Sequence, residues 1–201
     1  MENQAYNLAF ASIGKDVMIW PMAKIVQTEV ISLGDSVVID DFVFIMGGKK
    51  TILGSFTHVG CHSSILGGGE FIMDDFSTLS GGVRLYTGTD DYNGGSMTNP
   101  AVPEPYRIVS RSFIRIAKHV IVGTNSVLLP GIKIGEGAAI GACSLVKHDC
   151  EPWTIYAGSP AKPIKTRPKE KILELESQLK AKFYDRLGNY IPNNIRRIAS
   201  T

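Results

Sequence analysis

The 201-residue chain has no apolar run approaching the roughly 18 residues that a membrane-spanning helix requires. Its first residues, Met1 to Gln4, bring neither a basic start nor an apolar stretch, so we expect no secretory signal. The formal net charge is only +2, which gives no reason to expect a nucleic acid or an acidic membrane as a partner. The cytoplasm is therefore the expected compartment.

Cysteine is equally scarce. Cys61, Cys143 and Cys150 stand in neither a CxxC pair nor a Cys/His spacing that would bind zinc, so we expect no metal and interpret them as free thiols in a reducing compartment. Hydrophobic residues make up 44% of the chain and charged residues 20%, which is enough to bury a sizeable core. The length fits one domain, or one domain with a small appendage.

Aliphatic residues form a ladder with a six-residue period. In the second half of the chain the spacing holds without a change of frame, through Ile116, Val122, Leu128, Ile134, Ile140 and Val146. In the first half, triplets with the same spacing begin 20 residues apart: Ile13, Ile19 and Ile25; Leu33, Ile39 and Ile45; Leu53, Val59 and Ile65; Met73, Leu79 and Leu85. A period of six matches neither an α-helix nor a simple alternating strand.

This period suits a chain that follows a short flat strand, turns a corner, and returns after three sides to stack on itself. One aliphatic side chain per side then points to the axis, and burying each one contributes roughly 1.5–3 kcal/mol as an upper estimate. The alternative, a β-sandwich, would alternate with period two and vary its loop lengths. We predict an N-terminal segment over residues 1–12 and an all-β parallel β-helix domain over residues 13–151.

Two segments leave the ladder. Residues 87–112 are rich in glycine and proline, and we predict a long excursion loop from a corner that is able to wall a pocket. From Pro168 onward, apolar residues share one face of a predicted α-helix: Ile172, Leu175, Leu179 and Phe183. Pro168 suits the start of this helix and Gly188 suits its end. Residues 168–201 are therefore expected to form a C-terminal α-helix and tail.

Two segments carry a family resemblance. They are the run VGTNSVLLPG at residues 122–131 and the run PWTIYAGSPAK at residues 152–162. With the ladder, they resemble the hexapeptide-repeat acyltransferases, specifically the galactoside and maltose acetyltransferases and their relatives in cell-surface polysaccharide biosynthesis. The resemblance covers about residues 10–167. It implies a left-handed parallel β-helix, a homotrimer with active sites between subunits, and acetyl-CoA as the acetyl donor.

The resemblance also implies a coenzyme groove beside the last coils. By position it would be lined by small or polar residues: Gly123, Thr124, Gly141, Ala142, Ala157, Gly158 and Ser159. Backbone groups at glycine corners can pair with the pantetheine amides, and small residues let that chain approach. Lys162, Lys165 and Arg167 form a basic cluster suited to the coenzyme's phosphates, with a solvated basic end as the alternative. Residues 152–167 are therefore predicted to be a coenzyme-binding segment.

Transfer of an acetyl group to a sugar hydroxyl requires a base for the hydroxyl proton. In galactoside-type relatives the base is a histidine shortly after the rung that starts the long loop, and Asp90 occupies that place here. His58 and His62 lie in the coil whose counterpart lines the acceptor pocket, and an unperturbed histidine is a ready base at neutral pH. We predict His58 or His62 as the base with Asp90 or Asp91 orienting it, or one of these carboxylates as the base itself. The remaining alternative is recognition by position, with catalysis left largely to the backbone.

Gly60, Asp91 and Tyr92 are predicted to contact the acceptor substrate, whereas His119 and His148 are expected at solvated surface positions. The first choice of function is an acetyl-CoA-dependent O-acetyltransferase that acts on a sugar hydroxyl in a surface polysaccharide such as O-antigen, or on its precursor. An N-acetyltransferase of a nucleotide-linked amino sugar is the second choice. A β-helical scaffold or a carbonic-anhydrase-like zinc protein is the third, and zinc would require a third well-placed histidine.

Overall fold

The computed structural model describes residues 3–192. The chain divides into two units, of which the first ends at Arg167 and the second begins at Pro168. Within the described residues, no helix is both long enough and apolar enough to span a membrane.

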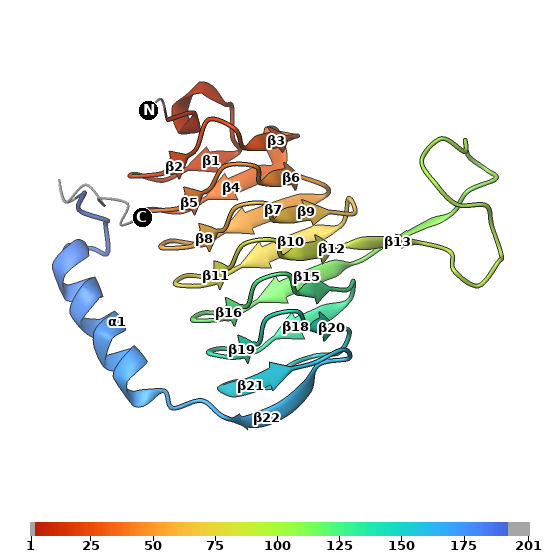
Figure 1. Ribbon diagram of the computed structural model, residues 1–201. Helices are drawn as coiled ribbons and strands as arrows, with labels where there is room; N and C mark the ends of the chain where they lie inside the picture. The colour runs from red at the N-terminus through yellow and green to blue at the C-terminus, as the bar shows by residue number, and fades with distance from the viewer. Residues whose placement is uncertain (1–2, 193–201) are drawn as a thin grey trace. The chain divides into compact units, whose positions relative to one another are not determined.

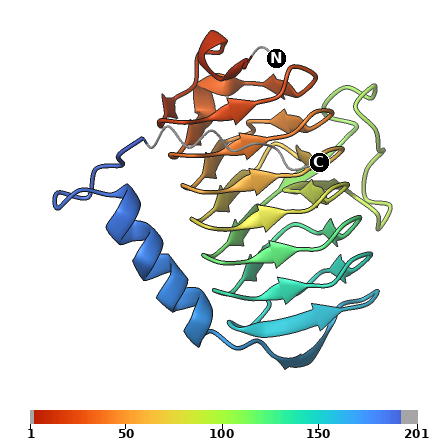
Figure 2. The same cartoon turned by 60° about the vertical axis from the view of Figure 1, so that its left-hand side comes forward.

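The first unit is a parallel β-helix in which the chain visits three sheets in turn (Figures 1 and 2). Sheet A contains β1 (Ser12–Ile13), β4 (Ile31–Leu33), β7 (Lys50–Leu53), β10 (Glu70–Met73), β15 (Phe113–Ile116) and β18 (Ile132–Ile134). Sheet B begins with β2 (Met18–Ile19), β5 (Val38–Ile39), β8 (His58–Val59), β11 (Thr78–Leu79), β16 (Ile121–Val122) and β19 (Ala139–Ile140). Sheet C contains β3 (Lys24–Val26), β6 (Phe44–Met46), β9 (Ser64–Leu66), β12 (Arg84–Tyr86), β17 (Val127–Leu128) and β20 (Leu145–Val146). We number the coils in chain order, each with one strand from each sheet.

The six-residue ladder forms the axis of the β-helix, as predicted. Parallel pairing joins residues 20 apart in the early coils, so that Ile13, Leu33 and Leu53 stand directly above one another. The step from Met73 to Ile116 in the same column spans the long excursion. Of the predicted ladder residues, Ile13 in the first coil alone falls outside the buried core. The aliphatic spacing therefore predicted both the fold and its register.

The corner between sheets A and B is held in a left-handed backbone conformation, with φ of 56° at Phe56, 61° at Phe76, 60° at His119 and 50° at Trp153. This conformation is uncommon outside glycine. The rings stack along the corner, with centroids 5.3 Å apart for Phe56 and Phe76 and 5.2 Å apart for Phe76 and His119. The expectation that His119 is solvated is wrong, because this stacking buries its side chain.

Residues 87–112 leave the β-helix as the predicted excursion, and we call them the arm (Figure 1). The base of the arm is an antiparallel pair, β13 (Gly88–Asp90) and β14 (Val109–Arg111), which the sequence pattern did not predict. The tip, residues 91–108, contains no further strand and exposes large apolar side chains: Tyr92, Met97, Tyr106 and Ile108. The arm is therefore an ordered stem with an exposed tip.

The two ends of the β-helix are covered by its own chain. At the start, η1 (Ala5–Asn7) packs over the first coil, where Ala5 joins the buried core, and η2 (Thr28–Val30) leads into the second coil. At the other end, β21 (Thr154–Ala157) pairs in parallel with β19, and β22 (Lys162–Thr166) returns antiparallel beside it. This terminal hairpin contains most of the segment that was predicted to bind the coenzyme.

The second unit contains α1 (Glu170–Phe183), which confirms the predicted C-terminal helix. The helix ends well before Gly188, contrary to the prediction. The Asp185 carboxylate accepts two backbone N–H groups of the residues that follow it, each at 2.8 Å, and such a turn competes with helix continuation. Residues 193–201, the rest of the predicted tail, lie outside the described residues.

Candidate active site

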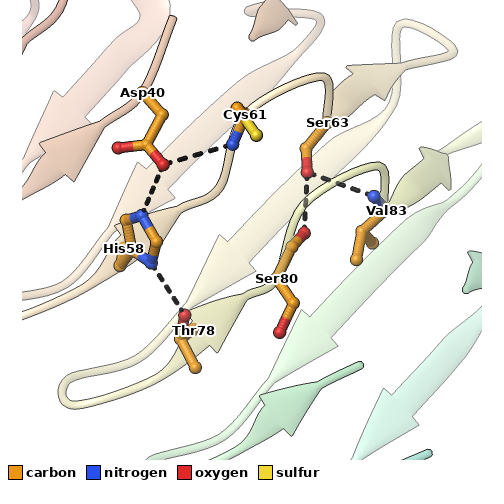
Figure 3. A network of polar contacts seen from close by, with 7 residues as sticks. All are labelled: Asp40, His58, Cys61, Ser63, Thr78, Ser80 and Val83. Atoms are coloured by element: carbon orange, nitrogen blue, oxygen red, sulfur yellow. Dashed lines mark hydrogen bonds and ion pairs between the residues drawn. The ribbon is translucent and has the colours of Figure 1, made fainter. Parts of the chain in front are cut away.

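A polar chain on the outward face of sheet B links the second, third and fourth coils (Figure 3). His58 in β8 points outward because its neighbour Val59 fills the core. The Nε2 of His58 lies 3.0 Å from the Oδ2 of Asp40, and its Nδ1 lies 3.2 Å from the Oγ1 of Thr78. The same Asp40 oxygen accepts the backbone N–H of Cys61 at 3.2 Å. We call Asp40, His58 and Thr78 the histidine cluster.

The histidine cluster is a consequence of the register. Thr78 pairs with His58 in the parallel sheet, and Asp40 is the first residue after the strand in the coil before. About two fifths of the His58 side chain is exposed (43%), as is 30% of the Asp40 side chain, so the ring can be reached from solvent. The sequence pattern selected His58 and missed its two partners, although the 20-residue period leads directly from His58 to Thr78.

His62, the second predicted base, lies at the corner between sheets B and C and outside this cluster. Its backbone is left-handed, with φ of 61°, and its exposed ring stacks on Phe42 with centroids 4.9 Å apart. Gly60 has a structural reason to be glycine, because a Cβ there would lie 2.7 Å from the backbone nitrogen of Gly81 in the next coil. Contacts of His62 and Gly60 with an acceptor stay predictions.

Small residues line the corner between sheets B and C along most of the β-helix. The residue after the buried position of a sheet B strand is Asp40 in the second coil and a small residue in the coils that follow: Gly60, Ser80, Gly123 and Gly141. In the terminal hairpin the corresponding residue is Ala157, the last residue of β21. The coils approach so closely that a Cβ at Gly123 would lie 2.5 Å from the backbone nitrogen of Ala142. Thr124 and Ala142, each at the next position along the chain, are exposed. Gly60, Ser80, Gly123, Gly141 and Ala157 form one strip along this corner, which we call the small-residue stripe, and three of them are predicted coenzyme residues.

The terminal hairpin is tied to the last coil at the end of this stripe. The Leu145 N–H donates to the Gly158 carbonyl at 3.0 Å, which fixes the turn between β21 and β22. Ser159 and Lys162 follow on the exposed surface, and Lys165 is exposed on β22. The structure therefore brings the predicted coenzyme segment together with the small-residue stripe.

Arg167 has a different environment from the two lysines. Its Nη1 donates to the carbonyl oxygens of His119 and Gly137, each at 2.9 Å, and so joins two coils at the corner between sheets A and B. Burial lowers the pKa of the Arg167 guanidinium, because desolvation disfavours its charged form. These contacts engage one nitrogen of Arg167 and distinguish it from Lys162 and Lys165, which are exposed. A contact of Arg167 with a coenzyme phosphate stays a prediction.

The arm and the outward face of sheet C border a pocket of about 1060 Å³, which we call the arm pocket. Its floor comes from sheet C and the residues that follow its strands: Met46, Leu66, Tyr86, Val127 and Leu129. Its walls add charged side chains: Asp90, Arg107, Arg111 and Lys147. Tyr92, a predicted acceptor contact, lines this pocket with 91% of its surface exposed, whereas the Asp91 carboxylate accepts the Asn93 N–H at 2.8 Å. The excursion therefore walls a pocket, as predicted.

Asp90 forms an ion pair inside the arm. Its Oδ1 lies 2.7 Å from the Nε of Arg107, and both side chains are more than two thirds buried. Among residues 3–192, the carboxylate that contacts His58 is Asp40, and Asp90 contacts neither His58 nor His62. The predicted pairing of a histidine with Asp90 is thus not formed within a single chain.

The period of the ladder and the stacked coils define the class of hexapeptide-repeat β-helix proteins. The family model for bacterial transferase hexapeptide (six repeats) matches residues 113–148. A dTDP-4-amino-4,6-dideoxy-D-glucose acyltransferase from Escherichia coli is 41% identical over 180 residues, which cover 89% of this chain and 93% of that protein. The chain belongs to the hexapeptide-repeat transferase family, and within it to the acyltransferases.

Crystal structures of AntD, an N-acyltransferase from Bacillus cereus, share this fold. The complex with dTDP and 3-hydroxybutyryl-CoA is 38% identical, with a TM-score of 0.81, and the match covers 86% of this chain and 91% of that chain. A serine-to-cysteine variant in complex with dTDP-4-amino-4,6-dideoxyglucose and coenzyme A is 36% identical, with a TM-score of 0.83 and coverage of 88% and 94%.

Similarity to an O-acetyltransferase is shorter. WbbJ from Escherichia coli K12, named as a putative lipopolysaccharide biosynthesis O-acetyl transferase, is 38% identical over 81 residues, which cover 37% of this chain and 41% of that protein. The relative that matches most of the chain at 41% identity is an acyltransferase of an amino sugar, and AntD is an N-acyltransferase. Acyl transfer to a sugar is therefore supported, and transfer to nitrogen is better supported than the transfer to oxygen that was our first expectation.

Proposed function

We propose that the protein is an N-acyltransferase that moves the acyl group of a coenzyme A thioester to the amino group of a dTDP-linked amino-dideoxy sugar. The observation that carries this proposal is the identity of 41% over 89% of the chain to an acyltransferase named for such a sugar. The AntD complexes support it, because they combine coenzyme A or its thioester with dTDP or this nucleotide sugar. Acetyl-CoA is the donor that we expect.

The donor lies along the small-residue stripe in this proposal. The close stacking of the coils requires the glycines of the stripe. They contribute to coenzyme binding only indirectly, because they keep the surface of the corner flat. Thr124 and Ala142 are the exposed residues beside that flat edge. Lys162 and Lys165 supply positive charge for the phosphates at the end of the stripe. Arg167 has no part in this proposal, because its guanidinium holds two backbone carbonyls.

The nucleotide of the acceptor occupies the arm pocket. A diphosphate carries negative charge, and Arg111 and Lys147 line this pocket. Tyr86 and Tyr92 add aromatic surface on which a pyrimidine base can stack. The volume of about 1060 Å³ is slightly above the usual range for small-molecule sites, roughly 300–1,000 Å³, and suits a ligand as large as a nucleotide sugar.

A second copy of the chain is needed to combine the two sites. The histidine cluster lies on sheet B and the arm pocket on sheet C, so one β-helix presents them on different sides. We expect a homotrimer whose active sites lie between subunits. The outward faces of sheets B and C support this, because partly exposed apolar side chains lie on both: Val38 and Ile121 on sheet B, Phe44 and Met46 on sheet C.

His58 is the base in this proposal. An amine that attacks a thioester has to lose a proton, and a neutral imidazole accepts one near neutral pH. His58 is preferred to His62 because Asp40 and Thr78 fix its ring. His62 stacks instead on an exposed aromatic ring at a corner.

Ser80 and Asp90 are the proposed acceptor contacts. AntD has been crystallised with one serine replaced and with one aspartate replaced. Ser80 and Asp90 are separated along this chain by the same number of positions as that pair. Ser80 lies in the small-residue stripe, and Asp90 lines the arm pocket. In this proposal Ser80 contacts the acceptor where it meets the donor, and Asp90 contacts the acceptor in the arm pocket.

Release of free coenzyme A thiol from acetyl-CoA tests the function. The informative acceptors are dTDP-4-amino-4,6-dideoxyglucose and its analogue with a hydroxyl in place of the amine. We expect rapid release with the amine, little with the hydroxyl, and an amide product that resists hydroxylamine. Release with hydroxyl acceptors alone, giving an ester that hydroxylamine cleaves, would overturn the proposal in favour of O-acetyl transfer.

A further inference from the structure

The histidine cluster allows an inference about proton transfer that rests on the proposed N-acyl transfer. We propose that Asp40, His58 and Thr78 form a proton relay. Thr78 takes the proton of the attacking amine, His58 takes the hydroxyl proton of Thr78, and Asp40 fixes the ring. Thr78 is then a catalytic residue that touches the substrate, and Asp40 is a positioning residue that acts through His58.

The hydrogen bonds of the cluster determine which ring nitrogen carries the proton. An ionised carboxylate has no proton to donate, so the contact between Asp40 Oδ2 and His58 Nε2 at 3.0 Å places the proton on Nε2. In a neutral ring, Nδ1 then carries a lone pair and faces the Thr78 hydroxyl at 3.2 Å. The hydroxyl donates in that contact, which leaves the lone pairs of its oxygen to accept from a substrate.

The route to the ring runs through Thr78. Both nitrogens of His58 are engaged, so the Thr78 oxygen is the acceptor that a substrate proton meets first. Thr78 is half-buried on the outward face of β11, two residues before Ser80 in the small-residue stripe. The Ser80 carbonyl accepts from the Ser63 hydroxyl at 3.0 Å, which joins the third and fourth coils at this corner (Figure 3). The relay therefore ends beside the strip along which the donor is proposed to lie.

The cluster is preorganised by the β-helix. Each of its three side chains comes from a different coil, and the parallel pairing of Thr78 with His58 sets one of the two contacts. The Cys61 N–H holds the Asp40 oxygen that contacts the ring. Groups fixed in this way need little rearrangement when charge develops, which is the arrangement that favours proton transfer in an active site.

The chemical step conserves atoms and charge. The amine nitrogen bonds to the carbonyl carbon of the thioester, and the carbon–sulfur bond breaks with its electron pair on the sulfur. The nitrogen proton passes to the Thr78 oxygen as the Thr78 proton passes to Nδ1 of His58. Asp40 stabilises the imidazolium that results. The imidazolium returns a proton through Thr78 to the thiolate, so the products are an amide and a free thiol and the cluster regains its starting state.

Kinetics and nitrogen NMR of the ¹⁵N-histidine-labelled protein together test the relay. Thr78→Val removes the hydroxyl and keeps the side-chain shape, so kcat should fall by roughly 10²–10⁴-fold while the KM for acetyl-CoA stays unchanged. Thr78→Ser restores a hydroxyl and should recover most of the rate. Asp40→Asn should lower kcat and abolish the preference for the proton on Nε2. The matched control is Asp35→Asn, because the Asp35 carboxylate also joins two coils, by accepting the Lys15 N–H at 2.8 Å, and lies outside the cluster.

Two results would overturn the relay. One is a folded Thr78→Val protein that retains most of its kcat, since a contact that merely joins the coils predicts lost stability without lost turnover. The other is a wild-type spectrum with the neutral His58 proton on Nδ1. The NMR result requires no substrate, so it is independent of the proposed function. A wild-type protein that fails to acylate the amino sugar would refute the function and leave the tautomer measurement standing.

Discussion

The histidine cluster and the arm pocket are built in opposite ways. His58 and Thr78 are one coil apart in parallel register, and Asp40 follows a strand of the coil before, so the repeat itself fixes their geometry. The arm leaves the repeat between β12 and β15, and its ion pair between Asp90 and Arg107 is made within the excursion. The repeat fixes the relative positions of side chains that can act in catalysis. The insertion forms one wall of a pocket, and its sequence can change without disturbing the coils.

The coils and the arm also differ in how far their large side chains are exposed to solvent. The coils bury a continuous aliphatic ladder, whereas the arm tip exposes large side chains such as Tyr92 and Tyr106. Loss of the tip should therefore cost the β-helix little stability. If the arm binds the acceptor and the coils carry the catalytic groups, substitutions in the arm change recognition of the nucleotide sugar. Substitutions in the histidine cluster then change turnover.

The largest effect is expected from shortening the arm. Asp90 and Val109 are paired across the stem, so a two-residue Asn-Gly turn can replace residues 91–108. We expect transfer to the nucleotide sugar to fall below detection, while coenzyme A binding by calorimetry and the thermal midpoint stay close to those of the wild type. Normal turnover of the shortened protein would show that the arm does not hold the acceptor.

Removal of the base should have the next largest effect. His58→Ala is expected to lower kcat by roughly 10²–10⁴-fold with little change in the KM for the nucleotide sugar, because the histidine acts on a proton and not in recognition. Steady-state kinetics measure both constants. His148→Ala is the control, since His148 is exposed and outside both sites. A His58→Ala protein that differs in KM alone would assign His58 to binding.

The basic residues near the terminal hairpin should separate into two groups. Lys162→Ala combined with Lys165→Ala is expected to weaken coenzyme A binding, by roughly tenfold for each phosphate contact that is lost. Arg167→Met should instead lower the thermal midpoint, because two backbone carbonyls lose their donor. Calorimetry and thermal unfolding distinguish these outcomes. Equal loss of coenzyme affinity in Arg167→Met, without loss of stability, would restore Arg167 to the phosphate site.

The smallest effect concerns Cys150 and pH. Burial raises the pKa of the Cys150 thiol from 9.0 to about 11, so the folded state favours the neutral thiol. Its contribution to stability is fully present below pH 9 and is lost as the pH rises from about 9 to about 11, because the unfolded thiol ionises first. Urea unfolding at pH 8 to 11 measures this change, and Cys150→Ala should flatten it. An equal loss of stability in that variant would exclude the thiol as the cause.

Periodic and local features were predictable from the sequence. The aliphatic ladder gave the β-helix and its register, the cluster of glycines and prolines gave the arm, and the apolar face after Pro168 gave α1. Contacts between segments were not predictable. Arg111 and Lys147 line the same pocket only because the arm leaves the β-helix next to sheet C. Nothing in the sequence around Arg167 indicates that its side chain binds two carbonyls on neighbouring coils.

The choice of acceptor was also beyond the sequence pattern. The ladder and the small-residue stripe describe the coils and one corner, and neither pattern indicates whether the acceptor is a hydroxyl or an amine. Asp90 stands where galactoside-type relatives have a histidine, and this departure left open which residue is the base. Its partner Arg107 lies at the far end of the arm loop, where spacing alone does not connect the two.

The most direct test of a site shared between the two regions is the activity of mixed oligomers. The His58→Ala protein keeps an intact arm, and the arm-shortened protein keeps an intact histidine cluster. Each should be inactive alone. If the active site takes the cluster from one copy and the arm from the next, co-expression of the two should restore a clear part of the wild-type rate of thiol release, and light scattering should show a trimer. A monomer, or a mixture no more active than the two variants measured separately, would contradict the account.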